Sequence, residues 1–316
     1  MTTTTQQSAL HDPKSAGGRA GDKIFSGITL TAGIVILAIL AFVALYLVIE
    51  SLPALTAGEG ELANGKTSFW SYVGPMMVGT LIASGVALLI ATPVAVGVAL
   101  FISHYSPKKL SQPIGYVIDL LAAIPSVVYG AWGMTFLGPL LVPAYRWLSE
   151  NAGWIPIFAG GYSQTGRTLF TASVVLAVMV LPIITSMCRE IFVQTPKLHE
   201  EAALALGATR WEMVKMAVFP FARAGIVSAV MLGLGRALGE TMAVALVLSP
   251  GVLSANLISA GNQTIPAEIA LNFPEAFGMR QNELIAAGLV LFVITLVVNM
   301  IARWIVSRHK EFSGAN

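Results

Sequence analysis

The chain has 316 residues, of which 56% are hydrophobic and only 11% are charged, and its formal net charge at neutral pH is +2. Soluble domains carry about 25% charged residues, so this composition indicates an integral membrane protein. The small net charge argues against nucleic-acid binding. The single cysteine, Cys188, excludes an internal disulfide and a multi-cysteine metal site, and no cofactor is expected.

Six apolar stretches are long enough to cross a bilayer, which takes about 20 residues in a helix. In chain order they are Ile24 to Ile49, Val73 to Ser103, Val117 to Val142, Leu169 to Met187, Phe221 to Leu248 and Leu284 to Val306. The polar residues 1–23 are expected to form a disordered tail, and residues 307–316 form a second tail. The predicted fold class is therefore an all-α integral membrane protein with both termini on one side.

Lysines and arginines are concentrated on one side of this arrangement. The segments on the side of the termini hold thirteen of them, whereas the opposite loops hold four: Lys66, Arg146, Arg167 and Arg280. Cytoplasmic loops carry the excess of basic residues in membrane proteins. Both termini and the loop at 195–220 are therefore expected to face the cytoplasm.

The string from Gly60 to Thr67 matches the phosphate-binding loop pattern G-x-x-x-x-G-K-T. That loop works only after a strand and before a helix that begins at the lysine, because backbone amides must surround the phosphates. Here the string lies in a short loop between two spans, on the side expected to be external. We interpret it as a chance match.

The segment from Thr195 to Pro220 is charged but has the pattern of ordered structure. Thr195 is expected to cap a helix that has Pro196 at its first position. Apolar residues at helical spacing give this helix one apolar face: Leu198, Ala202, Ala205 and Leu206. Gly207 ends it, and a T-x-x-E capping box and a closing proline predict a second short helix from 209 to 220.

The fifth predicted span contains two charged residues, Arg236 and Glu240, which are four positions apart and hence expected on one helix face. Each charge costs about 2.5–3.5 kcal/mol at the centre of a membrane helix on insertion scales. Gly235 and Gly239 form a close-approach G-x-x-x-G pattern beside them. The pair is expected either to line a pathway for a charged substrate or to form a structural ion pair that fixes helix packing.

The third predicted span contains Pro125, which is expected to kink its helix. A proline within a membrane helix frees a backbone carbonyl, and nearby polar or small residues must then satisfy it. Ser126 and Tyr129 follow the proline directly and supply such polar surface.

The motif E-A-A-x-x-x-G, from Glu201 to Gly207, resembles the EAA loop of permease subunits of ABC-type importers. In that family the loop forms a coupling helix that sits in a cleft of the cytoplasmic ATPase subunit. The resemblance implies five residues for ATPase docking: Glu200, Glu201, Ala202, Ala203 and Gly207. The alternative is an ordinary amphipathic segment on the membrane surface.

Two longer segments narrow the resemblance: L-L-A-A-I-P-S-V-V-Y-G-A-W-G at 120–133 and M-L-G-L-G-R-A-L-G-E-T-M-A-V at 231–244. Both resemble PstC-type permease subunits of bacterial phosphate uptake systems, and the likeness extends over about residues 23–308. It implies a first transmembrane helix at 24–49 followed by a type I importer core, the MetI-like permease domain, at 73–306.

The resemblance further implies a chain that moves inorganic phosphate across the bacterial cytoplasmic, or inner, membrane by alternating access. The chain itself is not expected to be an enzyme, because ATP is hydrolysed on a partner chain. The implied partners are a homologous second permease subunit, two cytoplasmic ATPase subunits and an extracytoplasmic phosphate-binding protein. Arg236 and Glu240 are assigned to the substrate pathway, and Pro125, Gly235 and Gly239 to a helix kink or close packing.

Three other functions are considered: a permease for another oxyanion such as sulfate or molybdate, a stand-alone secondary transporter or channel, and an intramembrane enzyme. A stand-alone transporter has no need of the EAA loop. The predicted spans contain no nucleophile–base pair and no metal-ligand constellation, which argues against an enzyme.

Overall fold

The computed structural model describes residues 16–63, 65–249, 254 and 256–308. The chain divides into two compact units, residues 1–49 and 50–316. Helix α1, Ala16–Thr56, makes up the described part of the first unit and runs into the second. The predicted tail at 1–23 is wrong for residues 16–23, which extend this helix, because extension adds one hydrogen bond per residue without a new nucleation cost. The remaining tail residues, 1–15 and 309–316, lie outside the described residues.

The regular elements of the second unit are helices. In chain order they are α2 (Phe69–Leu100), a π-helical turn (Phe101–Tyr105), α3 (Lys108–Ala122), α4 (Ser126–Trp132), a π-helical turn (Gly133–Leu137), α5 (Gly138–Asn151), a 3₁₀ turn (Pro156–Phe158), α6 (Leu169–Val193), α7 (Lys197–Ala205), α8 (Arg210–Met213), a π-helical turn (Val214–Val218), α9 (Phe219–Leu238), α10 (Met242–Val247), α11 (Ile265–Asn272), a 3₁₀ turn (Phe273–Glu275) and α12 (Met279–Arg308).

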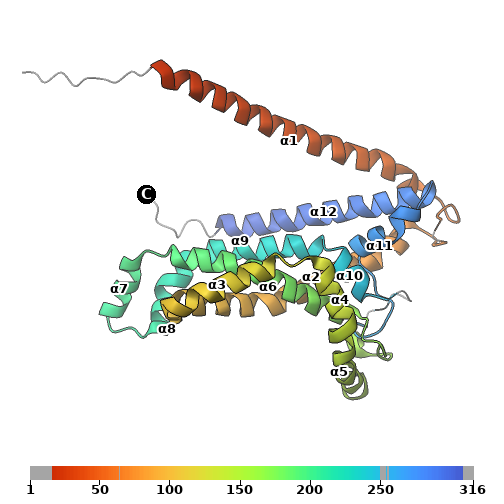
Figure 1. Cartoon of the computed structure of the whole chain (residues 1–316). Coiled ribbons are helices and arrows are strands. Elements are labelled where there is room, and N and C mark those ends of the chain that lie inside the picture. The colour runs from red at the N-terminus through yellow and green to blue at the C-terminus, as the bar shows by residue number, and fades with distance from the viewer. Residues whose placement is uncertain (1–15, 64, 250–253, 255, 309–316) are drawn as a thin grey trace, which may run out of the picture. The chain divides into compact units, whose positions relative to one another are not determined.

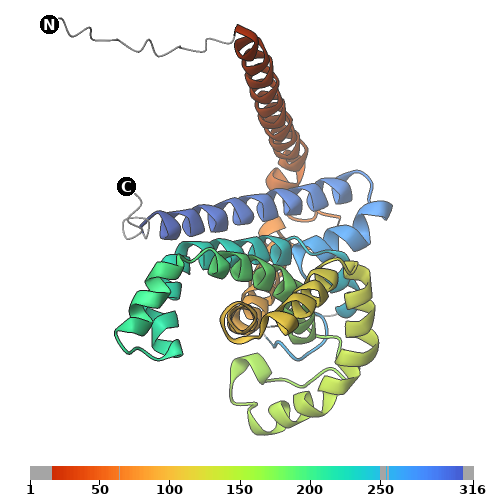
Figure 2. The ribbon, with the colours of Figure 1, turned by 60° about the vertical axis from the view of Figure 1, so that its left-hand side comes forward.

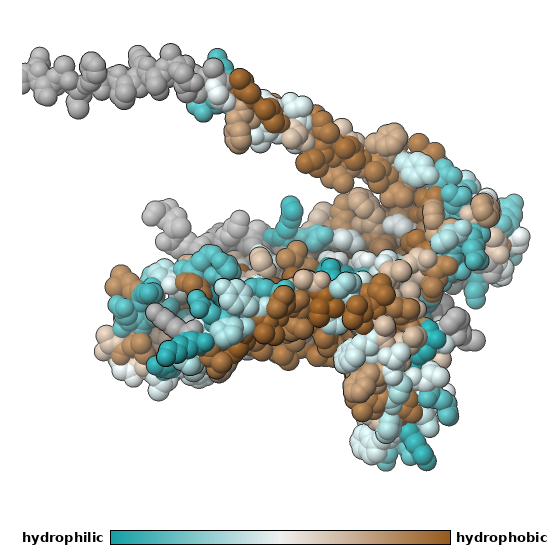
Figure 3. All heavy atoms as spheres, in the orientation of Figure 1, coloured by the Kyte–Doolittle hydropathy of each residue, from teal (hydrophilic) through white to brown (hydrophobic). Residues whose placement is uncertain are grey.

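Six helical segments in the described residues are long and apolar enough to cross a membrane, which confirms the predicted fold class. They are Gly21–Thr56, Phe69–Tyr105, Ser126–Asn151, Leu169–Val193, Arg210–Leu238 and Met279–Trp304. Within the second unit, apolar side chains gather over the middle of the helical bundle and polar ones toward its two ends (Figure 3).

The core of the second unit is the contact of α2 and α9 with α6 (Figure 1). Helix α2 has a buried alanine at every fourth position: Ala83, Ala87, Ala91, Ala95 and Ala99. Small residues at this spacing let two membrane helices approach closely. On α9, Gly233 serves the same purpose, because an added Cβ would lie only 2.8 Å from the side chain of Ile184 on α6.

The chain changes direction between α3 and α4. Helix α3 ends at Ala122 and α4 begins at Ser126, so the single kinked helix predicted for this span is wrong. The break follows from Pro125, which has no N–H to donate and keeps the preceding residue out of the helical region. Across the break, the Tyr129 hydroxyl donates to the Leu121 carbonyl at 2.9 Å.

Helix α5 runs across the direction of the long helices. Helix α3 lies along α6, whereas the chain from α4 through α5 points away from the bundle in both ribbon views (Figures 1 and 2). Gly130 permits the close packing of α4 on α10, because a Cβ there would lie 2.8 Å from the Cα of Ala243 on α10. Helix α5 is therefore placed at the end of the bundle opposite α7 and α8 (Figure 1).

The string that matches a phosphate-binding loop lies in the connection between α1 and α2. Helix α2 begins at Phe69, with Ser68 as its N-cap, and not at Lys66. Backbone amides of a helix N-terminus are thus not placed around the lysine as a phosphate-binding loop requires.

Candidate functional site

The loop at 195–220 folds as a helix, a glycine turn and a second helix, as predicted. Gly207 has a φ of +85°, in the left-handed region that glycine adopts without strain. In the next turn, the Glu212 carboxylate accepts from the Thr209 N–H at 2.8 Å, and the Thr209 hydroxyl accepts from the Glu212 N–H at 3.3 Å. This reciprocal pair is the predicted capping box.

Both outer ends of the loop differ from the prediction. Pro196, not Thr195, is the N-cap of α7, and the Thr195 hydroxyl is buried with no hydrogen-bond partner among the described residues. Pro220 does not close the second helix, because helical structure continues from Arg210 to Leu238. The proline lies in the first turn of α9, directly after a π-helical turn, where a missing N–H is tolerated.

The residues predicted to dock an ATPase point in two directions. Glu201, Ala202 and Gly207 are exposed, whereas Ala203 is only 7% exposed. Leu198 and Leu206, on the predicted apolar face, are 74% and 85% exposed. An apolar surface of this kind outside the bundle core is typical of a protein-binding site.

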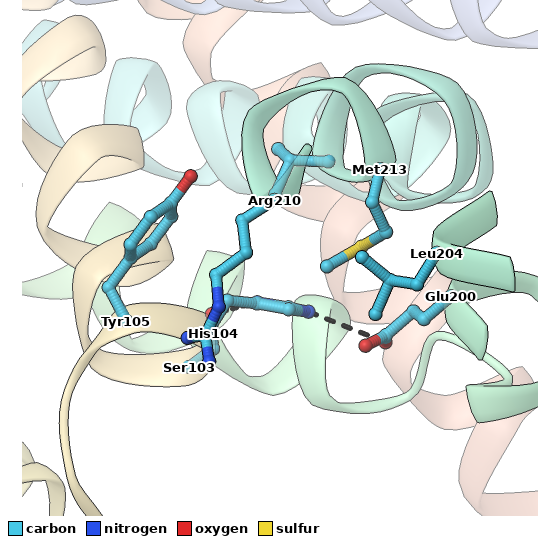
Figure 4. Close-up of a pocket in the computed structure, with 8 residues that line it drawn as sticks. Ser103, His104, Tyr105, Glu200, Leu204, Arg210 and Met213 are labelled. Carbon is cyan, nitrogen blue, oxygen red and sulfur yellow. Dashed lines mark hydrogen bonds and ion pairs between the residues drawn. The ribbon is translucent and has the colours of Figure 1, made fainter. Parts of the chain in front are cut away.

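Glu200 faces the bundle and joins the loop to the end of α2 (Figure 4). Its carboxylate lies 3.4 Å from the His104 Nε2 atom, and the His104 Nδ1 atom lies 2.7 Å from the Ser103 hydroxyl. These side chains line a cavity of about 270 Å³ together with Tyr105, Leu204, Arg210, Met213 and Val214. Glu200 of α7 is thereby in contact with His104 of the π-helical turn that continues α2, one of the three helices that form the core.

The fifth predicted span is broken where its two charges lie. Helix α9 ends at Leu238 and α10 begins at Met242, so Arg236 and Glu240 are not neighbours on one helix. No ion pair within 4.0 Å joins them in the described part of the chain. The predicted i,i+4 pairing is thus wrong, because α9 ends at its C-cap residue Gly239, and glycine is a poor helix former.

Each charge instead sits at the favourable end of its own helix. Arg236 lies in the last turn of α9, where a cation offsets the negative end of the helix dipole. The Glu240 carboxylate, one residue before the N-cap Thr241, accepts from the Ala243 N–H at 3.2 Å and offsets the positive end of the α10 dipole. The two side chains also differ in exposure, because Glu240 is 8% exposed whereas Arg236 is exposed.

Arg236 lines an open cavity of about 580 Å³ between three membrane helices. The other lining residues are Ile183 of α6, Ser228, Met231, Leu232 and Gly235 of α9, and Asn299 of α12. Arg236 has no hydrogen bond or ion pair within the described residues. A free guanidinium in such a cavity can bind an anion through two parallel hydrogen bonds.

The glycine pattern beside the charges does not mark a helix contact within this chain. A Cβ on Gly235 would meet nothing within 4 Å, and one on Gly239 would meet only the Gly235 carbonyl. A close approach of another helix at this surface therefore stays a prediction about a partner chain.

A polar cluster at the end of the bundle opposite α7 was not anticipated from the sequence. Arg280 lies 2.8 Å from Glu268 and 3.0 Å from Glu283, whose side chain is fully buried. The Tyr72 hydroxyl donates to Glu268 at 2.9 Å, and Glu283 also accepts from the backbone N–H of Ala63. The cluster joins α2, α11, α12 and the loop before α2. Its residues are spread over 220 positions of the sequence, so no local sequence pattern predicts the cluster.

Residues 91–311 match the family model described as "Binding-protein-dependent transport system inner membrane component". The chain is 42% identical over 300 residues to "Phosphate transport system permease protein PstC 2" of Mycobacterium tuberculosis, which covers 90% of this chain and 91% of that protein. It is 39% identical to "Phosphate transport system permease protein PstC" of Mesorhizobium japonicum, with 93% and 92% covered. The protein of that name from Haemophilus influenzae is 36% identical, with 93% and 95% covered.

Two solved structures share the fold at low sequence identity. One is an inward-facing MetNI methionine ABC transporter, with a TM-score of 0.56, 16% identity and coverage of 75% of this chain and 96% of that chain. The other is a bacterial alginate ABC transporter in complex with an alginate pentasaccharide-bound periplasmic protein, with a TM-score of 0.60, 17% identity and coverage of 92% and 96%. The predicted permease core is thereby confirmed as a fold.

Proposed function

The chain belongs to the family of binding-protein-dependent transport system inner membrane components, and we propose that it is the permease subunit of an ATP-driven phosphate importer. The observation that carries the proposal is 42% identity, over 90% of the chain, with a protein named as a phosphate transport permease. Membership of this family makes the chain a multi-pass inner-membrane protein that works with an ATPase and a substrate-binding protein. Sulfate or molybdate transport is not favoured, because the relatives that cover most of this chain are named for phosphate.

Arg236 is the proposed contact for the substrate. Phosphate at neutral pH carries one to two negative charges, and moving it through a membrane without a partner would require a large desolvation free energy. The Arg236 guanidinium is exposed in the open cavity and can bind two phosphate oxygens at once. Glu240 acts differently, because its carboxylate holds the start of α10 and so fixes the break that positions Arg236.

The exposed part of the 195–220 loop is the proposed ATPase docking surface. Glu201, Ala202 and Gly207 lie on it with the exposed leucines of α7. Glu200 and Ala203 form its inner side, and the contact between Glu200 and His104 passes movement of the docked ATPase to α2. ATP hydrolysis would take place on two cytoplasmic ATPase subunits, and alternating access would follow from the movement of the helices.

A homologous second permease and an extracytoplasmic phosphate-binding protein complete the proposed assembly. Both termini would face the cytoplasm, because thirteen lysines and arginines lie in the segments on that side and four in the opposite loops. The end of the bundle that contains Arg280 would then face outward and receive the binding protein.

Uptake of labelled phosphate by a strain that lacks this chain tests the proposal. The wild-type gene should restore uptake, and excess sulfate or molybdate should not compete. Restored uptake that sulfate or molybdate suppresses would contradict the assignment of phosphate. Uptake that continues without the partner ATPase would contradict the assignment to an ATP-driven importer.

A further inference from the structure

We propose that Asn299 and Ser228 bind the transported anion together with Arg236, as an α9 half-site for a tetrahedral oxyanion that is completed by another chain. The α9 half-site is defined as Ser228, Arg236 and Asn299. The inference rests on the proposed function and adds two binding residues to it. All three side chains line the same cavity of about 580 Å³.

Asn299 is a polar side chain in an apolar helix. Between Leu284 and Ala302, only Thr295 and Asn299 have side chains that form strong hydrogen bonds. The Thr295 hydroxyl donates to the Leu291 carbonyl of its own helix at 2.8 Å. Asn299 has no such partner within the described residues. An amide that lacks a partner in hydrocarbon costs several kcal/mol, so this side chain must face water, substrate or another chain.

The side chains of α9 that line the cavity share one helix face. Ser228, Leu232 and Arg236 follow at intervals of four residues. Ser228 lies about 12 Å nearer the α7 and α8 end than Arg236, from the rise of eight helical residues. With that end facing the cytoplasm, an anion that leaves Arg236 toward the cytoplasm passes Ser228.

Neutral hydrogen-bond donors suit the part of the route between Arg236 and the cytoplasm. The Asn299 amide can donate to a phosphate oxygen without adding positive charge. The Ser228 hydroxyl donates to the Ala224 carbonyl at 2.9 Å in the structure, and it would have to rotate away from that carbonyl to donate to the anion. They would lower the desolvation free energy of the anion after it leaves Arg236 and still allow release. A second cation at this position would hold the anion more tightly, since charge-assisted hydrogen bonds are about twice as strong.

Two substitutions at one position separate anion binding from helix packing. Asn299→Leu removes the donor at nearly constant volume, and we expect uptake per assembled complex to fall about tenfold, the effect of one hydrogen bond to a charged group. Asn299→Asp replaces the donor with a negative charge. We expect a larger loss that increases from pH 6 to pH 8, as phosphate gains its second negative charge. Asn151→Asp, an exposed change on α5, is the matched control and should leave uptake unchanged.

Two outcomes would overturn the inference. One is wild-type uptake by the Asn299→Asp complex. The other is an equal loss for the leucine and aspartate variants at both pH values, which would mean that Asn299 only holds a partner helix. Arg236→Gln, measured in parallel, shows whether the proposed pathway or only the α9 half-site is wrong. If it transports normally, the proposed pathway itself is wrong, whereas if it fails while Asn299→Asp works, only the α9 half-site is wrong.

Discussion

Arg236 and Glu240 lie on either side of the break between α9 and α10. The sequence predicted Arg236 and Glu240 as the important residues, but their pairing assumed a continuous helix. Gly239 ends that helix, so each side chain instead compensates the dipole of its own segment. The exposure of Arg236 could not be predicted either, because the cavity wall includes residues of α6 and α12.

The absence of an ion pair in the described structure leads to a prediction for the double variant. Arg236→Gln should lower uptake by at least about tenfold, because a charge-assisted contact to phosphate is lost. Glu240→Gln keeps an oxygen that can accept from Ala243 but loses the charge, so its effect should be smaller. The double variant should transport no better than Arg236→Gln alone.

The measurement is phosphate uptake per assembled complex in the three variants. A structural ion pair would behave differently, since removing both partners leaves no charge buried alone and restores function. A double variant that transports near the wild-type rate would thus show that the two residues form a clamp and not a pathway.

Gly207 permits a second prediction at the residue scale. Its φ of +85° is unfavourable for a β-branched side chain by roughly 1–2 kcal/mol or more, although a Cβ there would meet nothing within 4 Å. Gly207→Val should therefore disturb the turn between α7 and α8 and stop uptake while the protein still reaches the membrane.

Gly60 is a matched control, because its φ is +86° and its surroundings are equally open. Gly60→Val introduces the same backbone strain in the opposite loop and should leave ATPase docking intact. Wild-type coupling of ATP hydrolysis to uptake in the Gly207→Val complex would contradict the role of this loop.

At the scale of elements, local signals account for some helix boundaries but not for the directions of the helices. The capping box of α8 and the break at Pro125 both follow from nearby residues. The direction after the break depends on contacts between distant segments, such as Gly130 against Ala243. The composition of residues 126–151 would suit a membrane span, yet α5 runs across the long helices (Figures 1 and 2).

We expect α5 to lie parallel to the cytoplasmic membrane, at its extracytoplasmic surface. Exposed apolar side chains lie at Phe136, in the π-helical turn before α5, and at Leu140 and Trp147 of α5, and Arg146 and Glu150 pair beside them on the helix surface. Tryptophan is enriched at membrane–water interfaces, and an amphipathic helix there buries one face. The third crossing would then consist of α3 and α4.

Spin labels in a Cys188→Ala background test this orientation in proteoliposomes. An in-plane helix predicts one common depth for labels at 136, 140 and 147, with accessibility to oxygen exceeding that to a water-soluble nickel reagent. Labels at 146 and 150 should show the reverse. A depth that changes steadily from 136 to 147 would mean that α5 crosses the membrane.

At the scale of the whole molecule, the sequence predicted the fold class and the family but not the contacts that hold its ends together. The fold class follows from the apolar length and the charged positions of single segments, and these can be read directly from the sequence. The Arg280 cluster and the Glu200–His104 contact each join segments far apart in the chain. Only the packed helices bring such residues together.

The Arg280 cluster should make a large contribution to the stability of the end of the bundle opposite α7 and α8. Arg280→Gln leaves the fully buried Glu283 and the largely buried Glu268 without their shared cation. Removing one partner of a buried ion pair costs about 3–5 kcal/mol. Arg146→Gln is the matched control, because it breaks an exposed pair with Glu150, and exposed ion pairs contribute little to stability.

Thermal unfolding of the purified complexes measures both effects. We expect a clear fall in the unfolding temperature for Arg280→Gln and almost none for Arg146→Gln. The triple variant Arg280→Met, Glu268→Gln and Glu283→Gln removes all three charges. It should recover part of the lost unfolding temperature, since no buried charge is then left without a partner. Equal unfolding temperatures for Arg280→Gln and Arg146→Gln would mean that the apolar contacts of α2, α11 and α12 hold this end of the bundle, with Arg280 contributing nothing.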